Sequence, residues 1–279
     1  MPIHDQGYRR YGGDRAPGGR AWAVIAGAGL RSRLGQRAFL GLLLVSWFPF
    51  FVRAVQIYAA ANLPQAAFLA PTPEMFRQFL EQQEVFLFFI TVYAGAGLIA
   101  SDRRANALQI YLSKPITRVE YVFGKLAILT TWLLAVTWVP AIVLLIVQIA
   151  FAGNFDFFTA NIYLFPAITV FAFLQTITIA TVMLALSSLS KSPRYVGILY
   201  AALVFFSQAL FGVLRFVTGD TSLSWISVLY DLNQVGDAIF RLPLRYDTPW
   251  PVSLAVLVVL VACAALVLER RVRGVEVVA

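Results

Sequence analysis

Six apolar runs, each long enough to cross a lipid bilayer, constrain the fold of this chain more than any other feature. A transmembrane helix needs about 20 mostly apolar residues at 1.5 Å rise per residue. Only 13% of the residues are charged, whereas soluble domains average about 25%. We therefore predict an all-α polytopic membrane protein whose six-span domain covers residues 38–268. The six predicted spans are residues 38–58, 85–100, 125–151, 161–187, 195–217 and 250–268.

The second run is short, but the stretch before it carries a helix-start signal. Thr72 is a good N-cap residue and Pro73 suits the first helical position, where its missing N–H is not needed. We expect the run to be the tail of a longer helix that begins outside the bilayer.

The basic residues predict the orientation in the membrane. Seventeen of the 22 lie before the first run, after the last run, or in the loops after the second and fourth runs. The excess of Lys and Arg in cytoplasmic loops places both termini in the cytoplasm and predicts a multi-pass protein of the cell (inner) membrane. These charges are spread over loops that face anionic lipid and do not form one patch, which argues against nucleic-acid binding.

The regions outside the spans are short. Residues 1–20 have the Gly- and Arg-rich composition of a flexible tail. Residues 21–37, AWAVIAGAGLRSRLGQR, predict an amphipathic helix lying in the membrane interface. Because a secretory signal has a shorter apolar core close to its start, we expect the first span to be uncleaved. Residues 269–279 are predicted to be a cytoplasmic tail.

The residues that membrane enzymes and ion-driven carriers place inside their spans are missing here. No Asp or Glu falls within the six runs, and the chain has one histidine and one cysteine, too few for a zinc or haem site. The phosphate-binding pattern G-x-x-x-x-G-K-[ST] is also absent, since FGKL lacks the first glycine and the hydroxyl. We predict a non-catalytic subunit that holds no metal or cofactor.

The most polar internal stretch, SDRRANALQIYLSKPITRVEYVFGK, follows the second run directly. Leu108, Tyr111 and Leu112 are spaced as an apolar stripe on a short helix. Ser101 and Asp102 stand where they could satisfy free N–H groups at its first turn. The pattern predicts a cytoplasmic helix between spans two and three.

A turn and a new helix start complete this stretch. Pro115 disfavours helix at Lys114, and Thr117 with Glu120 forms the spacing of a capping box. An ordinary capped loop explains these signals as well as a functional one, because capping signals are common.

The segment LIASDRRANALQIYLSKPITRVEYVFGK, from Leu98 to Lys125, resembles permease subunits of ABC-2 type ATP-binding cassette transporters. In that family an acidic, arginine-containing start leads to a short helix, a leucine-serine-basic-proline turn and a Gly-Lys pair entering span three. The six-span layout and the SSLSKSPR turn extend the likeness. Asn106 and Ala107 stand where many members have glycine and threonine.

The resemblance implies a permease, with two copies or two related chains forming the path of an exporter. It implies that a separate cytoplasmic ATPase, which binds ATP and Mg, docks on the helix from Asp102 to Leu112, the coupling helix. Polar contacts would come from the charged start of that helix and apolar contacts from its stripe. The residues assigned to coupling are Asp102, Arg103, Arg104, Leu108, Tyr111, Leu112, Lys114, Pro115 and Glu120.

Three further features fit this interpretation, and the first two also have a simpler explanation. SLSWISVLYDLNQVGDAIF predicts short outer helices between spans five and six, or a helical surface loop. Polar residues within the spans could line a pathway or bond between helices: Gln148, Gln175, Thr178, Thr181 and Gln208. Gly197 and Ala201, four apart in span five, offer a small-residue face for packing in a dimer.

Two other function classes remain open from the sequence. One is a membrane scaffold or channel-like subunit with no transport cycle. The other is a secondary carrier, which the missing carboxylates disfavour. The sequence identifies neither a substrate nor a choice between homodimer and heterodimer.

Overall fold

A computed structural model describes residues 20–107 and 116–272, and these residues contain helices and no strands. The order of elements is α1 (Ala21–Leu34), α2 (Arg37–Ser46), α3 (Phe48–Asn62), η1 (Pro64–Leu69), α4 (Pro73–Gln82), α5 (Glu84–Ile90), η2 (Thr91–Gly95), α6 (Gly97–Arg104), α8 (Arg118–Val136), α9 (Trp138–Ala152), α10 (Asp156–Ala160), α11 (Leu164–Leu189), α12 (Pro193–Thr218), η3 (Ser224–Ile226), α13 (Val228–Ile239) and α14 (Trp250–Arg271).

Six helical stretches are long and apolar enough to cross a membrane, which confirms the predicted number of spans. Span one is α2–α3, span two α4–α6, span three α8–α9, and spans four, five and six are α11, α12 and α14. Span two runs from Pro73 to Arg104, so the short run is the second part of a longer helix, as expected. Thr72 accepts a hydrogen bond from the Met75 N–H at 3.3 Å, which confirms it as the N-cap.

Prolines interrupt spans one and three, and a π-helical turn interrupts span two. Pro140 lacks an N–H and its ring excludes the carbonyl four residues earlier, at Val136, where α8 ends. Pro49 acts in the same way just after the break at Trp47. Span two contains η2, a single π-helical turn, a feature that is common at functional sites.

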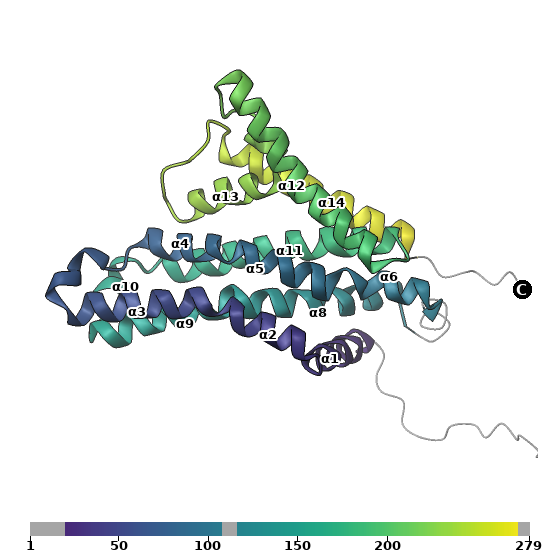
Figure 1. The fold of residues 1–279 in the computed structure, drawn as a ribbon, viewed down its shortest axis with the longest axis horizontal. Helices are drawn as coiled ribbons and strands as arrows, with labels where there is room; N and C mark the ends of the chain where they lie inside the picture. The colour runs from purple at the N-terminus through teal and green to yellow at the C-terminus, as the bar shows by residue number, and fades with distance from the viewer. Residues whose placement is uncertain (1–19, 108–115, 273–279) are drawn as a thin grey trace, which may run out of the picture.

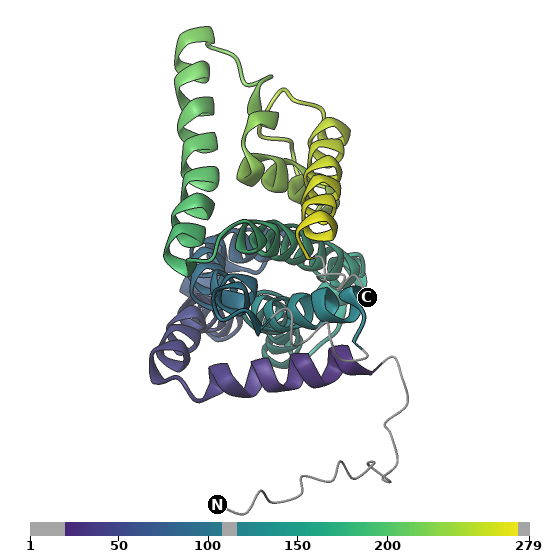
Figure 2. The ribbon, with the colours of Figure 1, turned by 90° about the vertical axis from the view of Figure 1, so that its right-hand side faces the viewer.

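The spans form a bundle from which two helices diverge. Figure 1 shows α3, α9, α4, α5, α8 and α11 running side by side, while α12 and α14 lean away from them. Figure 2 shows α13 between these two diverging helices. Helix α11 is the centre of the bundle, with 72% of its most apolar stretch buried, against 28% for α12 and 22% for α14. The two diverging helices therefore leave much of their apolar surface for lipid or another subunit.

Helix α1 crosses the spans at one end of the bundle (Figure 2). It packs on α8 through two glycines that permit close contact. A Cβ on Gly124 would lie 2.9 Å from Ile25, and one on Gly29 would lie 2.2 Å from Ile128. A helix is present over Ala21–Leu34, within the range 21–37 where an amphipathic helix in the membrane interface was expected, and its position in the interface stays a prediction.

Candidate functional site

The end of the bundle at which α6 finishes and α8 begins carries the polar stretch singled out in the sequence, and we call it the basic end. The last turn of α6 holds Arg103 and Arg104, and the last turn of α14 holds Arg270 and Arg271. Of the residues assigned to coupling, Leu108, Tyr111, Leu112, Lys114 and Pro115 lie outside the described residues.

Asp102 connects span two to span three at this end. Its Oδ2 lies 2.7 Å from the Nζ of Lys125 and accepts a hydrogen bond at 2.7 Å from the hydroxyl of Tyr121. Tyr121 is fully buried, and the Lys125 ammonium lies 5.4 Å from its ring centroid. The carboxylate is therefore held by two groups on the first turns of α8, a contact stronger than a neutral hydrogen bond.

The position of Asp102 corrects the expected helix boundary. Ser101 and Asp102 belong to the last turn of α6, so they do not begin the next helix. A carboxylate at the C-terminal end of a helix is unfavourable beside the helix dipole. The ammonium of Lys125 compensates for it, a partner that local sequence rules do not reveal.

Span two is also attached to span four near the basic end. The Ser187 hydroxyl accepts hydrogen bonds from the N–H groups of Ile99 and Ala100 at 3.1 and 3.0 Å and donates to the Ala96 carbonyl at 2.8 Å. These backbone groups follow the π-helical turn, where the regular ladder is interrupted. The Arg103 guanidinium donates a hydrogen bond to the Ser188 carbonyl, so its positive charge lies against span four.

The π-helical turn is contacted from two other sides. Arg33 of α1 donates to the Ala94 carbonyl at 3.1 Å. A Cβ on Gly95 would lie 2.6 Å from Met183, so only glycine permits this close approach to α11. Helix α1 and spans two and four are therefore joined at one irregular turn.

The remaining coupling residues are placed as follows. Arg104 is exposed. Glu120 accepts from the Thr117 N–H at 3.0 Å while its own N–H donates to Thr117 Oγ1 at 3.2 Å, which confirms the capping box. This cap fixes the direction in which the chain enters span three.

The polar residues predicted along a pathway do not form one group. Gln175 and Thr178 are buried in α11, Gln148 is buried in α9, and Gln208 is half-buried in α12. Among the described residues, no side chain or backbone group bonds to the Gln175 amide or the Thr178 hydroxyl. Thr181 lies on the wall of a groove between α8 and α14.

Gly197 of span five faces the interior of its own chain. A Cβ there would lie 3.2 Å from Val92, and Ala201 is half-buried. The close approach that Gly197 permits is to span two of the same chain, so the small-residue face expected for a dimer is partly used within the subunit.

The structure adds a buried ionic cluster at the opposite end of the bundle that the sequence did not predict. We use the term ionic cluster for Arg77, Glu81, Asp237 and Arg245. Arg77 is fully buried; its Nε lies 3.1 Å from Asp237, and its Nη2 donates to the Asn233 Oδ1 at 2.6 Å. A buried cation of this kind is tolerated only when its charge and its donors are matched.

Arg245 completes the ionic cluster from the loop before span six. Both of its terminal nitrogens lie 2.7 Å from the Glu81 carboxylate, and its Nε lies 2.7 Å from Asp237. Burial raises the pKa of Asp237, and the two arginines oppose that rise. The hydrogen bonds that Arg245 donates to the Glu81 carboxylate raise the pKa of Arg245, so the guanidinium remains charged.

The cluster fixes α13 against α4 and α11. A Cβ on Gly236 would lie 2.7 Å from both the Arg77 Nε and the Phe171 ring, so glycine is needed for this contact. The i, i+4 spacing of Arg77 and Glu81 was a signal in the sequence. Nothing local connects them to Asp237 and Arg245, which come more than 150 residues later.

The chain was compared with known protein families. The family model described as ABC-2 family transporter protein matches residues 85–268, which include the later part of span two, the polar stretch, spans three to five and most of span six. No curated protein matches the chain.

Proposed function

Because the chain belongs to the ABC-2 transporter family, we propose that it forms half of the translocation path of an exporter and works with a separate cytoplasmic ATPase. It is a multi-pass membrane permease subunit, and the family is generally non-catalytic. The proposal covers the direction of transport, the ATPase and the second permease copy. ATP and Mg²⁺ would be bound by the ATPase.

The linkage at the basic end is the observation that carries the proposal. The segment between Arg104 and Arg118 joins two spans whose facing ends are held together by Asp102 and Lys125. Arg103, Ser187 and Arg33 extend the linkage to span four and to α1. A force applied to this segment would therefore move several spans as one body, which is what coupling to an ATPase requires.

The far end of the path would be covered by α13. The ionic cluster holds this helix on α4, and Asp231 and Leu232 on its other side are fully buried. Opening that end requires separating α13 from span two, which exposes or rearranges the four charges. We propose that the transport cycle supplies this energy, and that Gln175 and Thr178 line the path on α11.

The test replaces the apolar stripe of the proposed coupling helix. The double variant Leu108→Glu/Tyr111→Glu would place two unpaired charges against the ATPase surface, at a cost of several kcal/mol and about 100-fold or more in affinity. We expect the variant to insert, to form a complex with two permease copies, and to lose the ATPase and transport.

A matched control carries the same change at the opposite end. Trp225→Glu/Leu244→Glu alters two exposed residues between spans five and six. This variant should keep the ATPase. Native mass spectrometry of the purified complex reports both subunit counts. A full complement of ATPase on the Leu108→Glu/Tyr111→Glu variant, or a single permease copy in the unaltered complex, contradicts the proposal.

A further inference from the structure

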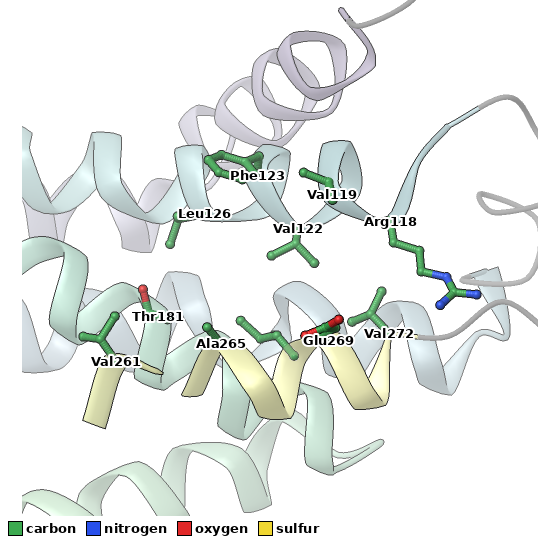
Figure 3. A pocket seen from close by; sticks show the side chains of 11 residues that line it. Arg118, Val119, Val122, Phe123, Leu126, Thr181, Val261, Ala265, Glu269 and Val272 are labelled. Carbon is green, nitrogen blue, oxygen red and sulfur yellow. The ribbon is translucent and has the colours of Figure 1, made fainter. Parts of the chain in front are cut away.

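A groove with a volume of about 520 Å³ lies between α8 and α14, with α11 at its wall. Figure 3 shows Val122 and Leu126 facing Val261 and Ala265 across it. Its size falls in the range of about 300–1,000 Å³ that is usual for small-molecule sites. The lining is apolar except at Thr181 and at one end.

That end carries one positive and one negative side chain. Arg118, the first residue of α8, and Glu269, in the last turns of α14, lie toward the same end of the groove (Figure 3). Both are exposed, and neither takes part in an ion pair within the described residues. Two opposite charges thus stand at the basic end of an apolar slot.

The depth of the groove matches half of a bilayer. Val261 and Glu269 are eight residues apart on α14, which corresponds to about 12 Å at 1.5 Å per residue. One leaflet contributes about half of the 30 Å hydrocarbon core. The charged end lies where span three begins and span six finishes, so it is placed at the level of the lipid headgroups.

We propose that this groove binds one phospholipid with a zwitterionic headgroup carrying a primary ammonium, as in phosphatidylethanolamine. The phosphate lies against Arg118, the ammonium donates to Glu269, and an acyl chain fills the slot beside Ala265. An anionic lipid would leave Glu269 facing a negative headgroup, and a quaternary ammonium could not donate a hydrogen bond. The inference is independent of the direction of transport and of the ATPase.

The test measures lipids retained by the purified full chain. The protein is incubated in mixed micelles with equal amounts of phosphatidylethanolamine, phosphatidylcholine and phosphatidylglycerol, and bound lipids are identified by native mass spectrometry. We expect phosphatidylethanolamine to be preferred by about threefold or more, as for one partly exposed ion pair. Glu269→Gln should remove this preference, and Arg118→Gln should lower the retention of all three lipids.

A second pair of variants tests the slot itself. Ala265→Phe should lower the retention of all three lipids by filling the slot. Ala262→Phe, an exposed position of α14 outside the groove, should behave as the unaltered chain. A preference for phosphatidylglycerol, no preference, or full retention by the Ala265→Phe variant overturns the proposal. If Ala265→Phe changes the number of permease copies in the complex but leaves the amount of retained lipid unchanged, a second copy covers the groove and the proposal is wrong.

Discussion

Replacing Arg77 by methionine tests whether the ionic cluster holds α13 in place. The change keeps much of the apolar volume over Phe171 but removes a fully buried cation that lies 3.1 Å from Asp237 and bonds to Asn233 at 2.6 Å. Asp237, whose side chain is 1% exposed, then keeps only Arg245 as a cationic partner. Breaking a buried pair by removing one member costs about 3–5 kcal/mol. This is a large part of a typical total stability of about 5–15 kcal/mol.

The assay is unfolding in mixed micelles by a denaturing detergent, with the free energy of unfolding compared between variants. Arg241→Met is the matched control, because Arg241 is exposed and lies 4.5 Å over the Tyr163 ring, a contact worth about 0.5–1 kcal/mol. The double variant Arg77→Met/Asp237→Asn should recover about 2 kcal/mol, since it no longer leaves a buried carboxylate with reduced compensation.

The reasoning fails if Arg77→Met destabilises no more than Arg241→Met. It also fails if the double variant is as unstable as the sum of its single variants, because the two side chains would then be energetically independent.

Two further predictions concern α13 and the topology. Burial raises the pKa of Asp231 to about 7, with the Ser253 hydroxyl acting in the opposite direction. The folded chain therefore binds more protons than the unfolded chain between pH ~4 and ~7. The free energy of unfolding should fall as the pH rises through that window. Asp231→Asn should reduce the fall in thermal-unfolding measurements, leaving the contributions of the other carboxyl groups, among them Asp237; an unchanged profile would refute the assignment. Single cysteines at Ser113 and Ser222 in a Cys263→Ser background should react with an impermeant maleimide from opposite sides, and outside labelling of both would contradict the six-span topology.

The sequence by itself determined the features that depend on neighbouring residues. The length and apolar content of the runs are sufficient for six membrane helices, because a lipid-exposed backbone must satisfy its own hydrogen bonds within each helix. Thr72, and Thr117 with Glu120, were recognisable as caps because each partner lies within three residues. The motif from Leu98 to Lys125 likewise indicated the family that the model match confirmed.

The tertiary structure decided which residues meet across the chain. Asp102 looked like a helix start, but the α6 helix continues through it and Lys125 of another helix compensates its charge. Gly197 looked like a contact between subunits, and it lies against Val92 of its own chain. Arg77 and Arg245 lie far apart in the sequence, yet they share Asp237 at the opposite end of the bundle from Asp102. These outcomes depend on which helices pack together, and spacing along the chain carries no information about contacts more than a few turns away.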